Sequence, residues 1–329
     1  MSNHTNTFGD MVFSFFRGYL KGQKGCSPNT VASYGDCVRL LIEHVRDASG
    51  VQIDQIAIEA IDEKVVLDFL DSLERKRNNL PITRNQRLAA IKSFFRFLAT
   101  QEPELIAVCE RICAIPAKSV ERGPVDSMSV EQAWAIVNAA NPVSLAGARD
   151  RAILLLFYNT GARVQEIADL NVGDFQLKQA PLVHLTGKGG KRREVPLWDE
   201  TAEAIELYLQ RRRDQGIESD AFALNQKHER MGRFGLAHLV KKYKMIAQEN
   251  CESLRNLNVT PHTFRHTAAL ALVQAEVNIV SIKKWLGHAD IKTTSMYMEI
   301  NIEMKREALR KYPPPTLDKQ PNLEWKKPD

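Results

Sequence analysis

The stretch that decides the fold and its chemistry reads PHTFRH at residues 261–266, LGH at 286–288 and TTSMYM at 293–298. His262 and Arg265 are three residues apart, so on a helix they share one face and can contact a single ligand. His288 follows in a predicted turn, and Tyr297 lies in a segment that Asp290 is placed to cap as a helix. The pattern predicts that histidines, an arginine and a tyrosine converge.

These residue types together match the chemistry of a phosphodiester. Arginine offers a rigid fork of donors that fits phosphate oxygens, and histidine can move protons near neutral pH. Tyrosine can serve as a covalent nucleophile. The predicted substrate of this stretch is therefore a phosphodiester.

A second block, NTGARVQEIADL at 159–170, places an arginine at a corner between two predicted helices. The apolar run that starts at Asp150 predicts a core helix ended by Gly161, and Arg163 follows at once. An arginine at a helix start is usually a solvated surface residue, but this corner can hold a rigid guanidinium against a phosphate. Glu166 is predicted to orient Arg163 rather than to act as a catalytic acid.

A third block, LTGKGGKRREVPL at 185–197, has two short apolar runs around a basic, glycine-rich turn, which predicts a β-hairpin. The turn lacks the spacing and the serine or threonine of a phosphate-binding P-loop. Taken alone, its lysines are those of a solvated turn.

The blocks PHTFRH, KKWLGHADIKTTSMY, NTGARVQEIADL and LTGKGGKRREVPL resemble, in order and approximate spacing, the four signature blocks of the tyrosine recombinase (phage integrase) family. The resemblance implies a mainly α fold with a small antiparallel β-sheet (α+β). It also implies a helical, SAM-like core-binding domain that precedes a mixed catalytic domain.

The resemblance implies six catalytic positions, which are Tyr297, Arg163, Lys188, His262, Arg265 and His288. Tyr297 would attack the scissile phosphate to give a 3′-phosphotyrosine and a free 5′-hydroxyl. Arg163 and Arg265 would clamp the nonbridging oxygens, and Lys188 would be the general acid. His262 would manage the tyrosine proton, and the remaining histidine would hydrogen-bond the phosphate. The scheme calls for no metal, no other cofactor and no ATP.

The composition along the chain predicts the disordered ends and the linker, and the resemblance implies the roles of the two domains between them. The predicted parts are a disordered N-terminus (1–7), a helical DNA-clamp domain (8–114), a linker (115–128), a catalytic domain (129–312) and a mobile tail (313–329). Because so little precedes Phe8, we expect the chain to lack the arm-binding domain of many phage integrases.

The N-terminal helical region carries candidate contacts to the DNA backbone. The segments SPNTVASYGDCVRLL at 27–41 and RLAAIKSFFRFL at 87–98 resemble the core-binding domain that clamps one side of the duplex. The candidates are Arg84, Arg87, Lys92 and Arg96 here, and Lys191, Arg192 and Lys241 in the second domain. Arg193 is assigned with its neighbours to backbone contacts or to solvent. Each basic run could equally be a solvated face.

The composition indicates the cellular compartment but does not identify a binding partner. Lys and Arg number 45 against 40 Asp and Glu, so the formal charge of +5 is compatible with a polyanion without demanding one. Five spread-out cysteines without a secretion signal predict reduced thiols in a cytoplasmic protein. The run MVFSFF at 11–16 is too short to span a membrane.

The predicted partners are double-stranded DNA attachment sites, bound by a homo-tetramer that exchanges C-terminal helices and passes through a Holliday junction. The sequence neither predicts nor excludes two further partners, an accessory DNA-bending protein and a partner recombinase. The favoured role is integration and excision of a mobile element. Three alternatives are a chromosome or plasmid dimer resolvase of the Xer type, a type IB topoisomerase, and a non-catalytic DNA-binding regulator derived from a recombinase.

Overall fold

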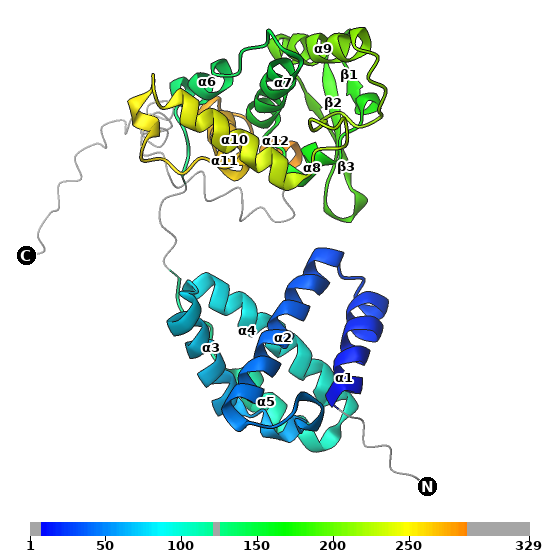
Figure 1. Cartoon of the computed structure of the whole chain (residues 1–329), viewed down its shortest axis with the longest axis vertical. Coiled ribbons are helices and arrows are strands. Elements are labelled where there is room, and N and C mark those ends of the chain that lie inside the picture. The colour runs from blue at the N-terminus through cyan, green and yellow to red at the C-terminus, as the bar shows by residue number, and fades with distance from the viewer. Residues whose placement is uncertain (1–7, 121–125, 288–329) are drawn as a thin grey trace, which may run out of the picture. The chain divides into compact units, whose positions relative to one another are not determined.

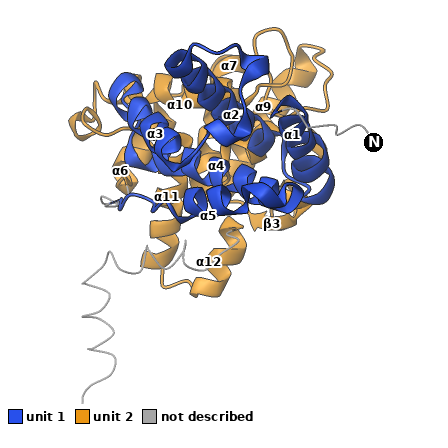
Figure 2. Ribbon diagram, turned by 90° about the horizontal axis from the view of Figure 1, so that it is seen from below, with its two compact units in different colours: residues 1–123 blue, residues 124–329 orange. Residues whose placement is uncertain are grey.

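A computed structural model describes residues 8–120 and 126–287, except for the side chain of Lys188 (Figure 1). The chain divides into two compact units, Met1–Gly123 and Pro124–Asp329, coloured separately in Figure 2. Residues 115–120 and 126–129 have no regular secondary structure. The predicted fold class, mainly helical with one small antiparallel sheet, is confirmed.

The first unit is entirely helical in its described part. Its helices are α1 (Phe8–Ser14), the π-helical continuation η1 (Phe15–Gln23), α2 (Pro28–Ser49), α3 (Glu63–Arg77), α4 (Pro81–Gln101) and α5 (Ile106–Ala114). Short 3-10 turns occupy Ile53–Gln55, Ile58–Ala60 and Pro103–Leu105.

Two helix starts in this unit follow from side-chain caps. Ser27 accepts from the N–H of Thr30 ahead of Pro28, and Asp62 accepts from the N–H of Val65 at the start of α3. The core contains packed aromatic rings such as Phe15 against Phe94, with centroids 5.1 Å apart.

The second unit combines helices with a three-stranded sheet. Its elements are α6 (Val130–Asn138), α7 (Leu145–Thr160), α8 (Val164–Ala168), β1 (Phe175–Gln176), β2 (Leu182–Thr186), β3 (Arg192–Pro196), α9 (Asp199–Asp214), α10 (Arg233–Ala247), α11 (Pro261–Gln274) and α12 (Ile279–Leu286). Short 3-10 turns occupy Val172–Asp174, Lys188–Gly190 and Glu252–Leu254.

The sheet has the order β1-β2-β3 and is antiparallel throughout. The predicted hairpin is confirmed, with Val183 opposite Val195 and Thr186 opposite Arg192. Because Val183 and Val195 are fully buried, one face of the hairpin packs on the core of the unit. The tip of the hairpin is left free of the core.

Helix α7 forms the centre of the second unit, where it packs against α6, α9 and α11. Every residue from 152 to 160 is buried. The helix starts earlier than the apolar run at Asp150 indicated, because Ser144 caps the N–H of Gly147. Gly161 ends it in the left-handed conformation, with φ of 58°, as predicted.

Two other helices in this unit also begin at capping residues. Ser129 and Gln132 form the capping box of α6, and Pro261 opens α11 after the cap residue Thr260. Among the described residues, we find no helix with the length and apolar character needed to cross a bilayer.

Candidate active site

Arg163 is held at the corner between α7 and α8 by Glu166. One oxygen of the Glu166 carboxylate, Oε2, accepts from the main-chain N–H of Arg163 at 2.8 Å. The other oxygen, Oε1, accepts from Arg163 Nη1 at 3.1 Å. The Arg163 side chain is nevertheless 40% exposed, so a ligand can reach it from solvent. Glu166 therefore orients Arg163, as the sequence predicted.

Arg265 links two sequence blocks that are far apart in the chain. It lies on α11 and is only 2% exposed. Its Nη1 donates to the carbonyl of Gly161 at 2.7 Å, and its Nη2 donates to the carbonyl of Leu286 at 2.8 Å. Arg265 thus connects the end of α7 to the end of α12.

Three arginines bind three successive carbonyls at the C-terminal end of α12. Arg193 Nε donates to Trp285 at 2.8 Å, Arg265 Nη2 donates to Leu286, and Arg163 Nη2 donates to Gly287 at 3.1 Å. The last carbonyls of a helix lack partners within the helix and form the negative end of its dipole, so cations stabilise them. The residue that follows this anchored end is His288.

The assignment of Arg193 to DNA-backbone contacts or solvent is wrong. Its side chain is 11% exposed, and Nη1 and Nη2 donate to the two carboxylate oxygens of Glu166, both at 2.8 Å. The signal was present in the strand pattern, because alternate residues of a strand share a face. Arg193 is two residues before the buried Val195, whereas Arg192 points to solvent.

Glu166 stays ionised at neutral pH despite its burial. Burial alone would raise the pKa of this carboxyl, but the hydrogen bonds and charge of Arg193 outweigh it, with help from Arg163. The pKa of Glu166 therefore lies below its ordinary value.

His262 and His266 lie side by side on α11, with ring centroids 4.4 Å apart. Partial burial lowers the pKa of His262, and the positive charges of Arg265 and Arg163 lower it further. Burial, His262 and Arg265 lower the pKa of His266 to about 4, against the raising effect of Asp126. Both rings are therefore neutral at pH 7, and a neutral His262 is able to accept a proton.

Three of the predicted catalytic groups lie outside the described residues. They are the side chain of Lys188 and the whole of His288 and Tyr297. The backbone of Lys188 opens the turn at the tip of the β2–β3 hairpin, where Gly189 and Gly190 have φ of 77° and 72°. The structure thus brings Arg163, Arg265 and His262 together, and the roles of all six residues stay predictions.

The candidate DNA-backbone residues differ in their surroundings. Arg96, Lys191, Arg192 and Lys241 are exposed. Lys92 is half-buried, and Arg87 is paired with Asp36 at 2.9 Å. These six stay predictions.

Arg84 is buried within the first unit, where only 4% of its surface is exposed, so it cannot contact DNA in this fold. Its Nε lies 3.8 Å from a carboxylate oxygen of Glu74. In the sequence, the basic run at 211–213 suits either a solvated face or a DNA contact, yet it contains one buried member. Arg212 donates to the carbonyls of Ser219 and Ala221 at 2.7 and 2.8 Å and closes a loop instead.

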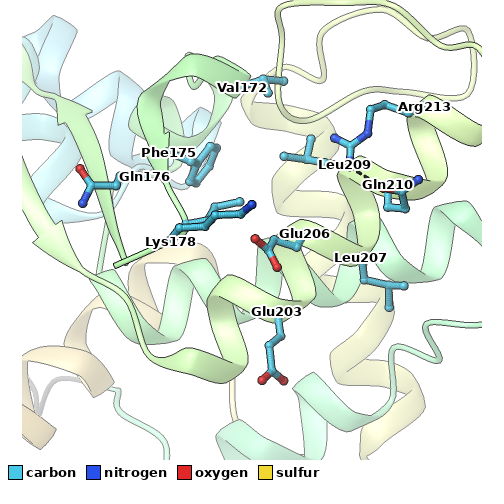
Figure 3. Close-up of a pocket in the computed structure, with 11 residues that line it drawn as sticks. Val172, Phe175, Gln176, Lys178, Glu203, Glu206, Leu207, Leu209, Gln210 and Arg213 are labelled. Atoms are coloured by element: carbon cyan, nitrogen blue, oxygen red, sulfur yellow. Dashed lines mark hydrogen bonds between the residues drawn. The ribbon is translucent and has the colours of Figure 1, made fainter. Parts of the chain in front are cut away.

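A surface pocket with both polar and apolar lining residues lies beside β1 and α9 (Figure 3). It is lined in part by Val172, Phe175, Lys178, Glu203, Glu206 and Arg213. The lining contains none of the predicted site residues. The arginine cluster around the end of α12 is therefore the candidate active site.

Comparison with known protein families shows the family of this chain. Residues 126–304 match the phage integrase family, and residues 14–102 match the phage integrase N-terminal SAM-like domain. The chain belongs to the phage integrase family of tyrosine recombinases.

Several relatives resemble this tyrosine recombinase over most of its length. The integrase/recombinase y4rC of Sinorhizobium fredii is 34% identical over 316 residues, which cover 95% of this chain and 94% of that protein. The tyrosine recombinase XerC of Myxococcus xanthus is 30% identical and covers 89% of this chain and 94% of its own.

Solved structures of tyrosine recombinases share the fold. The Tn1549 transposon integrase in complex with transposon right end DNA has a TM-score of 0.68 at 16% identity, and the match covers 92% of this chain and 99% of that one. The XerH recombinase bound to its difH substrate has a TM-score of 0.66 at 20% identity, covering 94% and 90%.

Proposed function

We propose that this tyrosine recombinase is a site-specific enzyme that cuts and rejoins DNA in the integration and excision of a mobile element. One observation carries the proposal. Arg163 and Arg265, which are 102 positions apart in the sequence, are held together at the end of α12 immediately before His288. Two arginines so placed can bind the two nonbridging oxygens of one phosphate.

In the proposed reaction the Tyr297 hydroxyl oxygen attacks the scissile phosphorus. A tyrosine–phosphorus bond forms as the bond to the 5′ oxygen breaks, and Lys188 donates a proton to that leaving oxygen. His262 accepts the tyrosine proton, and its lowered pKa keeps it neutral and ready to do so. Because one phosphotyrosine replaces one phosphodiester, the bond energy is kept and ATP is not consumed.

The charge balance of the site favours the pentavalent transition state. Arg163 and Arg265 supply positive charge where negative charge develops on the phosphate oxygens. His288 would add a hydrogen bond to the same group. Glu166 does not cancel both arginines that touch it, since Arg163 and Arg193 share one carboxylate.

The proposed partner is double-stranded DNA, bound by four copies of this chain in the cytoplasm. The fold supports this assembly, since a lambda integrase tetramer bound to a Holliday junction has a TM-score of 0.65 to this chain at 14% identity. The C-terminal helix that we expect to pass between protomers lies outside the described residues. Accessory DNA-bending proteins or a partner recombinase stay part of the proposal.

The likeness to XerC favours one second candidate, a chromosome or plasmid dimer resolvase. The mobile-element reading is preferred because y4rC, described as an integrase/recombinase, is 34% identical, against 30% for the Myxococcus XerC. DNA from the ends of the element that carries the gene, compared with DNA from dimer-resolution sites, distinguishes the two. Cleavage confined to the dimer-resolution sites would reverse the preference.

The proposal is tested with suicide DNA substrates nicked beside candidate crossover sites, incubated with the purified chain in EDTA and without ATP. We expect a covalent protein–DNA adduct that survives SDS and is absent from Tyr297→Phe. Tyr312→Phe, which removes a nearby tyrosine in the sequence, is the matched control and should form the adduct. Tight binding by the wild-type protein without any adduct would favour the non-catalytic DNA-binding alternative.

A further inference from the structure

Every nitrogen of the Arg193 guanidinium is engaged in the interior of the second unit. Nη1 and Nη2 form a bidentate pair with Glu166, and Nε donates to the carbonyl of Trp285. A guanidinium presents its donors in a fixed plane, so these bonds set the relative position of α8 and the end of α12. Arg193 itself belongs to β3, which leads from the hairpin tip at Lys188.

Glu166 joins Arg193 to Arg163. Its Oε1 accepts from Nη1 of both arginines, and its Oε2 accepts from the main-chain N–H of Arg163 and from Nη2 of Arg193. The Glu166 side chain is only 4% exposed, and a buried carboxylate is tolerated only when it is paired. Arg193 neutralises it, which leaves the charge of the half-exposed Arg163 available to an anion.

The fit around Arg193 depends on a glycine at the end of α12. Gly287 has φ of 65°, and a Cβ added there would lie 2.9 Å from Arg193 Nη1. The guanidinium therefore lies close to the chain one residue before His288. A side chain at Gly287 would require the Arg193 guanidinium or the chain at Gly287 to shift.

We propose that Arg193 is a positioning residue for DNA cleavage, which holds together the Lys188 hairpin, Arg163 and the chain that leads to His288. This inference rests on the proposed function. Arg193 acts through Glu166 and Trp285 and does not contact the phosphate. The three catalytic segments are thus presented as one unit before DNA arrives.

The first test compares Arg193→Gln and Arg193→Lys with Arg255→Gln. Arg255 lies in the same unit, is 59% exposed and is 2.8 Å from Glu252, so it controls for the loss of a paired charge. DNA affinity and the rate of adduct formation at saturating DNA are measured separately. We expect the Arg193 variants to bind DNA within about threefold of wild type and to cleave about 100-fold more slowly, as a misplaced catalytic group does. Lysine should not rescue, because it lacks the fork.

A pH profile separates positioning from a general loss of structure. Without Arg193, the buried Glu166 carboxyl loses its main stabilising partner and its pKa rises. The cleavage rate of Arg193→Gln should then fall on the acidic side at a higher pH than in wild type. Adding Glu166→Gln should remove this shift, and the double variant should cleave no more slowly than the slower single variant.

Two outcomes would overturn the proposal. Folded Arg193→Gln that cleaves at the wild-type rate would remove the positioning role. A parallel loss of affinity with a shallower salt dependence would instead make Arg193 a phosphate contact.

Amide hydrogen exchange keeps the inference testable if the wild-type protein forms no adduct. Faster exchange in peptides 160–170 and 279–287 of Arg193→Gln, but not of Arg255→Gln, would support the positioning role while the proposed function fails. Unchanged exchange in both peptides would reject the positioning role by itself.

Discussion

The main-chain carbonyl of Gly161 accepts a 2.7 Å hydrogen bond from Nη1 of Arg265, across 104 positions of the chain. The contact requires α7 and α11 to approach closely at the left-handed residue that ends α7. A Cβ at Gly161 would lie 2.7 Å from Leu286 Cδ2 and 3.1 Å from Ala268 Cβ. The geometry of Arg265 therefore depends on a glycine at this position.

Gly161→Ala should destabilise the protein by about 1–3 kcal/mol, because alanine is strained in the left-handed conformation and its Cβ meets buried neighbours. Gly216→Ala is the matched control, since Gly216 has φ of 65° with open space around its Cβ position. The measurement is urea unfolding of both variants. Equal losses of stability would mean that the close approach to Leu286 and Ala268 contributes nothing.

Arg265→Lys should lose at least one of the two bonds to Gly161 and Leu286, because an ammonium cannot span both carbonyls as the fork does. We expect the free energy of unfolding to fall by about 1.5–3 kcal/mol, and adduct formation to fall more than binding. Chemical denaturation and single-turnover cleavage measure the two effects. Full cleavage by the lysine variant would show that the fork geometry is dispensable.

Acidification should destabilise the protein through His266. Its pKa is about 4 in the folded chain, below the ordinary value of 6.5, so between these values the unfolded chain binds more protons. Stability is therefore present above about pH 6.5 and is lost as the pH falls towards 4. Because the ring is only half-buried, we expect a discounted effect of about 1–2 kcal/mol.

The measurement is urea unfolding between pH 4 and pH 7.5, in wild type and in His266→Gln. The free energy of unfolding of the variant should change less with pH than that of wild type across the lower part of this range. A slope identical to that of wild type would assign the acid sensitivity to other groups, such as the neighbouring His262.

Arg84 and Arg96, on the same helix, should separate stability from DNA binding. The Nε and Nη1 atoms of Arg84 have no hydrogen-bond partner among the described residues. If Arg84 is replaced, Glu74 still has its ion pair with Lys118, whose Nζ lies 2.6 Å away. Arg84→Met should leave stability unchanged or raise it by up to about 2 kcal/mol, with no change in the salt dependence of DNA binding.

Arg96→Ala, at an exposed position, should instead reduce the slope of log affinity against log salt by about 0.9, the effect of one lost phosphate contact. Fluorescence anisotropy at several salt concentrations measures both slopes. A reduced slope for Arg84→Met with an unchanged slope for Arg96→Ala would reverse the assignment.

Local chemistry was readable from the sequence by itself. Ser27 and Asp62 mark helix starts because their side chains bond to N–H groups three residues away, and Gly161 marks a helix end because it accepts a positive φ. The β2–β3 hairpin was likewise set by alternating apolar residues around glycines. The order of the four blocks was sufficient to indicate the family.

Only the tertiary structure decided which arginines are buried and which are exposed. Arg84, Arg193 and Arg212 each sit in a basic segment that also suits a solvated or DNA-facing surface. Arg193 is buried because Glu166 and Trp285, 27 and 92 positions away, meet it there. A charged side chain is buried only where other residues pair with it. For these arginines the pairing residues are brought close by the packing of the fold, so the neighbouring sequence does not reveal them.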